Sequence, residues 1–298
     1  MRLVLIGGTG FLGRHCCVAL SDAAIQATTI SFRPDHRFLA EHAPTIAGAE
    51  VGSAEAEAAL AEADVVIHLG SLSRPASNQS AEAAEISQNV DPALRLFAAI
   101  AAGGKTPHVI YASSGGQIYG PDHAAPIHET APCLPVTPYG LGKQLIEDSL
   151  RYYERRGDVT ATILRLSNPA GRWQIGGKHG FISAAVTQAL RGEPLTLFGE
   201  GGNVRDYFDA DAFAAFVVDL VSRDEIPSGT FNIGSGVGRT EREIIDIVED
   251  VTGERIAIDQ KDGRPFDFPY AVLNCDHAER ALGWRCDGRI DGIIQKMA

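Results

Sequence analysis

Short apolar runs alternate along the chain with longer stretches whose apolar residues recur at helical spacing. The short runs cover residues 3–6, 25–30, 65–69, 109–112, 161–166 and 230–233. The longer stretches cover residues 11–20, 54–61, 92–102, 141–153 and 181–190. Apolar strands separated by helices are typical of βαβ units, whose strands run parallel and are buried on both faces. The pattern predicts an α/β fold with a doubly wound parallel sheet.

The alternation loosens from about residue 168 onward. A glycine-rich segment, NPAGRWQIGGKHG, precedes the predicted helix 181–190, and the polar segment GEGGNVRD follows it. We expect a smaller C-terminal α/β lobe here, over the carboxyl edge of the sheet, where ligands bind in open α/β folds. The predicted sheet domain comprises residues 1–167, and the chain returns to it at about residues 207–235. Residues 168–206 and 236–298 form the predicted substrate-binding lobe.

Composition and charge narrow the class of protein. With 298 residues, 45% of them hydrophobic and 21% charged, the chain can bury a sizeable core, so disorder is excluded. A formal net charge of −12 without a run of Lys and Arg excludes nucleic acid as the expected partner. No apolar stretch approaches the roughly 20 residues that cross a bilayer, and the first strand leaves no room for a signal peptide. We therefore predict a cytoplasmic protein without membrane contact. The five cysteines lack C-x-x-C spacing, so no metal site is expected.

The segment GGTGFLG follows the first predicted strand and directly precedes a helical stretch. Glycines at this place let the backbone turn tightly and approach a pyrophosphate, which the N–H groups and the dipole of the helix start stabilise. A glycine-rich turn without a ligand is the alternative, but the strand–loop–helix context favours a Rossmann domain that binds a dinucleotide. The candidate cofactor contacts in the loop are Gly7, Thr9, Gly10, Phe11, Leu12 and Gly13.

The end of the second predicted strand bears on the type of dinucleotide. A NAD-specific Rossmann domain normally has an acidic residue there, which binds the ribose 2′-hydroxyl. This chain has Ser31, followed two residues later by Arg33. A hydroxyl and a guanidinium suit a 2′-phosphate, so NADP stays open beside NAD. Alternatively, Arg33 is a solvated surface charge.

Tyr139 and Lys143 stand four residues apart in PYGLGK, so both side chains project from one face of a helix. A phenol has a pKa near 10, and a general base at pH 7 needs a shift of about 3 units, or roughly 4 kcal/mol. A neighbouring ammonium and an oxidised nicotinamide are positive charges that can supply it. Ser113 and Ser114 directly follow the predicted strand 109–112, at its carboxyl end, and are placed to hold a substrate oxygen. Alternatively, they cap a turn.

Taken in order, the motifs GGTGFLG, VVIHLGS, SSGGQIYG and YGLGK resemble those of the extended short-chain dehydrogenase/reductase family. The likeness is greatest to its NAD-dependent epimerase/dehydratase branch, and specifically to proteins like UDP-glucose 4-epimerase. It covers nearly the whole chain, continuing through LRLSNPAG, VRDYFDADAF, FNIGSG, RPFD and ALGW. The resemblance implies a nucleotide-sugar substrate and a homodimer formed by the helices at residues 92–102 and 141–153.

The resemblance also implies roles for residues on the cofactor side. Leu69, Gly70 and Ser71 would line the nicotinamide ribose. Tyr139 would be the catalytic acid and base, and Lys143 would bind the ribose and lower the pKa of the tyrosine.

On the substrate side, Asn168, Arg205 and Arg264 would surround the nucleotide diphosphate. The physical reason is sound, because a guanidinium forms forked hydrogen bonds to phosphate. The alternative is that these arginines pair with surface carboxylates. Ser113 and Ser114 would face the sugar.

The chain departs from the family pattern at three places. Ser31 replaces the acidic residue after the second strand, and Ser53 replaces the Asp that often contacts adenine. Gly115 occupies the position of the usual catalytic Ser or Thr, which leaves Ser114 as the candidate hydroxyl. The Thr-Asp-Glu triplet of sugar-nucleotide 4,6-dehydratases reads GGQ at residues 115–117, so dehydration is not expected.

Three functions follow from these residues. The predicted one is a nucleotide-sugar 4-epimerase that acts through a 4-keto intermediate with transient hydride transfer to a bound nicotinamide cofactor. The first alternative, favoured by Ser31 and Arg33, is an NADPH-dependent reductase of 4-keto sugar nucleotides. The second is a non-catalytic dinucleotide sensor, against which the presence of both Tyr139 and Lys143 argues.

Overall fold

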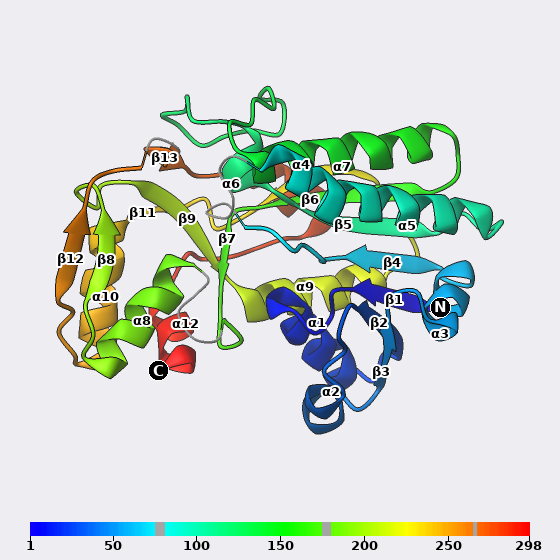
Figure 1. The fold of residues 1–298 in the computed structure, drawn as a ribbon, viewed down its shortest axis with the longest axis horizontal. Helices are drawn as coiled ribbons and strands as arrows, with labels where there is room; N and C mark the ends of the chain where they lie inside the picture. The colour runs from blue at the N-terminus through cyan, green and yellow to red at the C-terminus, as the bar shows by residue number, and fades with distance from the viewer. Residues whose placement is uncertain (75–80, 175–179, 265–266) are drawn as a thin grey trace.

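A seven-stranded, fully parallel sheet forms the centre of the molecule, in the order β10-β6-β5-β4-β1-β2-β3 (Figure 1). The structure, a computed structural model, describes residues 1–74, 81–174, 180–264 and 267–298. The strands of this sheet are β1 (Leu3–Ile6), β2 (Ala27–Ser31), β3 (Ile46–Glu50), β4 (Val65–His68), β5 (His108–Ser114), β6 (Thr160–Leu166) and β10 (Gly229–Ile233). The predicted Rossmann-type parallel sheet is confirmed, with its topological switch point between β1 and β4.

Helices cover both faces of this sheet (Figure 1). One face carries α3 (Ala54–Ala61), α5 (Asp91–Ala102) and α7 (Pro138–Arg155). The other carries α1 (Phe11–Asp22), α9 (Ala210–Val221) and α11 (Asp276–Leu282). Two apolar cores result, one on each side of the sheet. Because β4 and β5 are buried along their whole lengths, they read in the sequence as continuous apolar runs.

Short helices connect these elements near the carboxyl edge of the sheet. α4 (Glu82–Glu85) continues through a π-helical turn, η1 (Ile86–Val90), directly into α5. α6 (Gly115–Ile118) begins immediately after β5, and α2 (His36–His42) follows β2. No helix in the described ranges is both long enough and apolar enough to cross a bilayer.

The C-terminal half adds a second group of elements beyond the carboxyl ends of the parallel strands (Figure 1). One small sheet joins β7 (Asn168–Ala170), β9 (Val204–Asp209), β11 (Gly238–Thr240) and β13 (Tyr270–Ala271). A second pairs β8 (Leu195–Phe198) with β12 (Ile258–Lys261). Packed with them on a separate apolar core are α8 (Phe181–Arg191), α10 (Glu241–Thr252) and α12 (Asp291–Met297). The exact division of the chain into two domains stays a prediction.

The sequence analysis predicted no element between residues 30 and 54, where the structure has α2 and β3. β3 is the edge strand of the sheet, and only Ile46 and Ala49 of its residues IAGAE are buried. Small side chains such as Ala and Gly have low β propensity, so the strand forms through its pairing with β2 rather than through its own preference.

A buried ion pair fixes α7 to the sheet. Arg165 of β6 is 3% exposed, and Glu147 of α7 is fully buried. The Arg165 Nε and Nη2 atoms donate to the two carboxylate oxygens of Glu147 at 3.0 and 2.7 Å. Arg165 also donates to the Tyr119 hydroxyl at 2.9 Å, which in turn donates to Asn232 of β10 at 2.7 Å. Because Glu147 lies one turn after Lys143, the pair sets the position of the helix that carries the predicted catalytic lysine.

Replacing Glu147 by Gln should lower the free energy of unfolding by about 3 kcal/mol, because Arg165 keeps a buried charge without its partner. The same substitution at Glu41, whose pair with Arg37 is exposed, should change it by less than about 1 kcal/mol. Urea denaturation measures both. Equal, small changes in the two variants would contradict the anchoring role of the pair.

Candidate active site

The glycine loop and the segment after β4 touch through their backbones. Gly7 has φ +85° and donates its N–H to the Ile30 carbonyl at 2.8 Å. A Cβ atom built at Gly7 would lie 2.8 Å from Cα of Gly70, and one built at Gly13 would lie 2.2 Å from the Gly7 carbonyl oxygen. Side chains at Gly7 and Gly13 would push the glycine loop away from the segment after β4 and from the start of α1. In the described residues no side chain caps the start of α1, so its first N–H groups are open to a pyrophosphate, as a bound dinucleotide requires.

The remaining candidates on the cofactor side lie around this loop. Thr9 Oγ1 donates to Ser31 Oγ at 3.2 Å, which brings the end of β2 to the loop. Arg33 is exposed. Phe11 and Leu12 begin α1 and are partly buried, as are Leu69 and Gly70, whereas Ser71 is exposed. The structure thus gathers the predicted cofactor residues at the switch point of the sheet.

Ser53 has a structural task. Its hydroxyl accepts a hydrogen bond from the Ala56 N–H at 3.2 Å and caps the N-terminus of α3. The serine at this position, where the family pattern often has an adenine-binding Asp, is therefore explained by the helix that it starts.

Tyr139 and Lys143 lie in the first turns of α7, on one face of the helix. Thr137 caps this helix by accepting from the Gly140 N–H at 3.1 Å, and Pro138 occupies the first helical position. The Lys143 Nζ lies 5.6 Å from the centre of the Tyr139 ring and donates to the Ala112 carbonyl of β5 at 2.9 Å. The lysine is 5% exposed, so its ammonium is held inside the protein at the end of the sheet.

Burial acts in opposite directions on the two groups. It lowers the pKa of Lys143 to about 8, although the nearby carboxylates of Glu85 and Glu147 raise it. Burial raises the pKa of Tyr139 to about 12, against a hydrogen bond from Ser114 that lowers it. In the free protein the phenol is therefore protonated at pH 7, and its action as a base requires additional positive charge beside it.

The hydroxyl beside Tyr139 belongs to Ser114, at the end of β5. Ser113 is buried, and its Oγ has no hydrogen-bond partner in the described structure. Gly115 is closed off, because a Cβ atom built there would lie 2.6 Å from Cδ1 of Leu273. No side chain fits at residue 115 without moving Leu273.

The three predicted diphosphate ligands lie in the C-terminal half. Asn168 of β7 donates its side-chain amide to the Asp206 carbonyl at 2.9 Å. Arg205 of β9 makes one side-chain hydrogen bond within the described residues, to the Val204 carbonyl. Burial lowers the pKa of Arg205, and the positive charge of Arg264 acts in the same direction, whereas other neighbouring side chains raise it. The two guanidinium groups are therefore close enough to interact electrostatically. Two neighbouring guanidinium groups suit a diphosphate.

Arg264 is held from two sides. Its Nε and Nη2 atoms pair with the two carboxylate oxygens of Asp267 at 2.7 and 2.8 Å. Its guanidinium carbon also lies 4.2 Å from the centre of the Phe198 ring. The predicted alternative, a carboxylate partner, is thus present for Arg264. Residues 265–266 of the RPFD segment lie outside the described residues.

Asp206 links the predicted diphosphate ligands to the segment beside Ser114. Its fully buried carboxylate accepts hydrogen bonds from the N–H and hydroxyl of Ser235, both at 2.7 Å, and from the N–H of Gly236 at 3.2 Å. It also accepts from the N–H of Leu273 at 3.3 Å. Since the Leu273 side chain closes the space at Gly115, one carboxylate positions both the turn after β10 and the residue that bounds the catalytic edge.

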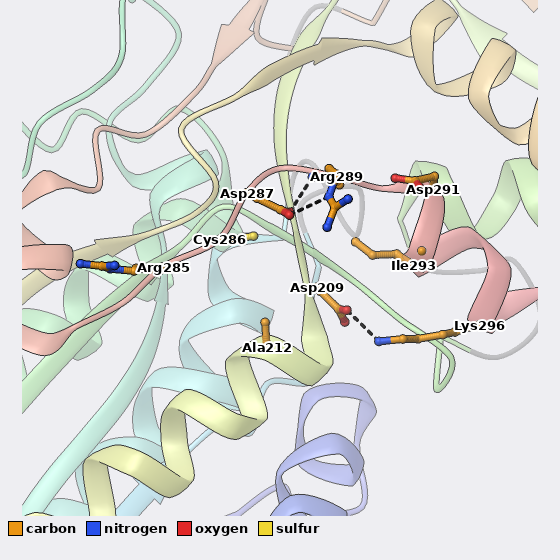
Figure 2. Close-up of a pocket in the computed structure, with 10 residues that line it drawn as sticks. Asp209, Ala212, Arg285, Cys286, Asp287, Arg289, Asp291, Ile293 and Lys296 are labelled. Carbon is orange, nitrogen blue, oxygen red and sulfur yellow. Dashed lines mark hydrogen bonds and ion pairs between the residues drawn. The ribbon is translucent and has the colours of Figure 1, made fainter.

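A large hollow lies away from these residues, against α9 and α12 (Figure 2). It measures about 650 Å³, and none of the predicted site residues lines it. Two ion pairs line it: Lys296 with Asp209 at 2.9 Å, and Arg289 with Asp287 at 2.7 Å. No metal-binding group of three or more His, Cys, Asp or Glu side chains occurs in the described part of the chain.

Comparison with known proteins places this geometry in a family. Residues 3–234 match the model of the NAD dependent epimerase/dehydratase family. The chain belongs to this family. A UDP-glucose 4-epimerase from Azospirillum brasilense is 31% identical to it, covering 99% of this chain and 90% of that protein.

Solved structures of other UDP-glucose 4-epimerases have the same fold. The enzyme of Thermotoga maritima, determined with UDP-glucose, is 25% identical with a TM-score of 0.88 and covers 100% of this chain and 97% of its own. The enzyme of Thermus thermophilus, in complex with NAD, is 23% identical with a TM-score of 0.85, and the coverage is again 100% and 97%. The predicted membership of the epimerase/dehydratase family, and NAD as its cofactor, are confirmed.

The sequence analysis missed one buried charge near the predicted catalytic pair, Tyr139 and Lys143. Glu85 is buried, and its carboxylate acts on both Tyr139 and Lys143. A signal was present, since Glu85 and Asn89 continue the four-residue spacing of the buried positions of α5 toward its N-terminal side. A polar pair that continues the buried face of the predicted helix 92–102 toward its N-terminal side points to a functional neighbour.

Replacing Gly115 by Ala should destabilise the protein by about 1–3 kcal/mol, because the added methyl group overlaps Leu273. The neighbouring Gly116→Ala variant is the matched control, because nothing lies within 4 Å of a Cβ atom there. Thermal unfolding should separate the two variants by several degrees. If the Gly115 variant were as stable as the Gly116 variant, the space at residue 115 would be open and a hydroxyl there would fit.

Proposed function

We propose that this chain interconverts the two C4 epimers of a UDP-sugar with a retained NAD, through a 4-keto intermediate. The observation that carries the proposal is the buried Lys143 ammonium beside Tyr139, with Ser114 hydrogen-bonded to that tyrosine at the end of β5. The names of the similar proteins support the reaction and the substrate class. They favour the predicted epimerase over both alternatives, the reductase and the sensor.

The chain's own residues move the proton and hold the sugar. The glycine loop and the segment after β4 would hold NAD, which would supply a reversible acceptor for the C4 hydride. Tyr139 removes the proton of the 4-hydroxyl as the ketone forms and gives it back in the second half of the cycle. The Lys143 ammonium stabilises the phenolate, which the free protein disfavours through burial. The Ser114 hydroxyl holds both the phenol and the sugar oxygen, in place of a side chain at Gly115.

Substrate binding uses the C-terminal half. Arg205 and Arg264 bind the diphosphate, and Asp267 fixes the plane of the Arg264 guanidinium. Asn168, anchored to the backbone of β9, contacts the substrate beside Arg205. Holding the substrate by its diphosphate leaves the sugar free to turn over between the two hydride transfers, which a 4-epimerisation requires.

Replacing Tyr139 by Phe should lower kcat by at least about 10²-fold, because the proton of the 4-hydroxyl loses its acceptor. Tyr152→Phe makes the same change on the exposed face of α7 and should leave kcat unchanged. Both proteins, denatured and analysed by mass, should release NAD in near-stoichiometric amounts. Full turnover by the Tyr139 variant would remove the assignment, and an empty protein that binds added NADPH would favour the reductase.

We also propose that the chain is a homodimer through α5 and α7. Leu94 of α5 is an exposed apolar side chain on this face, and Leu94→Arg should give a monomer because an unpaired charge would be buried in the interface. Leu190→Arg, an equally exposed change on α8, is the control and should leave the dimer intact. Light scattering measures the mass; a monomeric parent protein at working concentration would remove the claim.

A further inference from the structure

Glu85 occupies a space that the neighbouring helix leaves for it. The residue ends α4, is 7% exposed and packs against α7. A Cβ atom built at Gly142 of α7 would lie 2.4 Å from the Glu85 Oε1 and 2.7 Å from its Cγ. Any side chain at residue 142 would therefore displace the carboxylate. Lys143 is the next residue in the chain.

The Glu85 carboxylate is also tied to the segment after β4. The side chains of Ser73 and Asn89 are hydrogen-bonded to it. Asn89 in turn donates to the Ser73 hydroxyl at 3.1 Å and accepts from the Leu72 N–H at 2.8 Å. Glu85 thus links the segment expected to line the nicotinamide ribose with the helix that carries Tyr139 and Lys143.

Among the ionisable groups around the lysine, Glu85 is the larger of the two negative charges that stabilise its ammonium. His68 of β4 is neutral, because burial and the Lys143 charge lower its pKa to about 3. Burial likewise holds the pKa of Tyr111 of β5 well above its ordinary value, so its phenol is neutral. The phenol of Tyr139 is protonated, and Glu147 is already paired by the buried Arg165.

We propose that Glu85 is a positioning residue of the active site: a buried carboxylate, accommodated by the missing side chain of Gly142, that keeps Lys143 in place and in its charged form. The inference deepens the proposed function, because a charged Lys143 is what makes Tyr139 a usable base. Glu85 touches neither substrate nor cofactor and acts through the lysine.

The sign of the effect follows from the charges. Burial disfavours the ammonium, and the anion of Glu85 opposes burial by raising the pKa of Lys143. Without the anion, the pKa of the lysine falls below about 8, so the fraction of charged lysine at pH 7 to 8 decreases. As the pH rises, catalysis that needs the ammonium of Lys143 is then lost at a lower pH than in the parent protein.

The direct test is to titrate Lys143 in Glu85→Gln by NMR of ¹³C-labelled lysine. The chain has five lysines, and Lys143→Met identifies the signal of residue 143. We expect the pKa of Lys143 to fall by about one pH unit or more relative to the parent. The alkaline limb of kcat/KM should move down by the same amount. Glu82→Gln, the same change at an exposed position of α4, should leave both unchanged.

A second route removes the same contact without touching Glu85. Gly142→Ala should lower the pKa of Lys143 in the same direction, because the methyl group displaces the carboxylate. In a Glu85→Ala background the space is free, and adding Gly142→Ala should change little further. This non-additivity ties the effect to the Glu85–Gly142 contact rather than to either residue alone.

An unchanged pKa of Lys143 in both Glu85→Gln and Gly142→Ala would overturn the proposal, as would equal shifts in Glu82→Gln. If Glu85→Gln fails to fold, Gly142→Ala with its double variant decides the question. The titration does not depend on turnover. If the parent protein lacks epimerase activity but Glu85→Gln still lowers the pKa of Lys143, the proposed function is refuted and the role of Glu85 stands.

Discussion

A positive charge buried at the end of a parallel sheet sets the requirements for much of this molecule. The Lys143 ammonium loses its hydration, and the protein replaces it with the Ala112 carbonyl, two carboxylates and the rings of Tyr111 and Tyr139. These partners come from β5, α4 and α7 itself, so α7 must sit in one register against the sheet. The buried pair between Glu147 and Arg165 provides that register one helical turn away.

The predicted diphosphate ligands of the C-terminal half are connected to this centre through a hydrogen-bonded carboxylate. Asp206 accepts four hydrogen bonds, and its last donor is the backbone of Leu273, whose side chain closes the space at Gly115. The strand that carries Arg205 therefore also fixes the wall beside Ser114. The positions of Arg205 and Ser114 are therefore linked through Asp206 and Leu273, although no single segment spans both.

Local motifs were predicted well and long-range contacts were not. The glycine loop, the Tyr139 and Lys143 pair and the strands buried on both faces each leave a signature within a few residues of sequence. Glu85 against Gly142, and Leu273 against Gly115, are contacts between residues far apart in the chain, and a glycine gives no sign of what fills the space beside it. The same limit explains why β3 was missed, since its pairing with β2 supplies what its own residues lack. Ser53 looked like a lost adenine contact and is a helix cap.

The contact of Gly7 with Gly70 has a thermodynamic meaning beyond its geometry. Two segments more than sixty residues apart meet through main-chain atoms alone, and neither has a rotamer to choose when a ligand arrives. The freedom of both segments is lost while the chain folds, at the expense of the stability of the fold. A ligand that binds beside this contact meets segments that are already ordered, so their ordering costs no binding free energy.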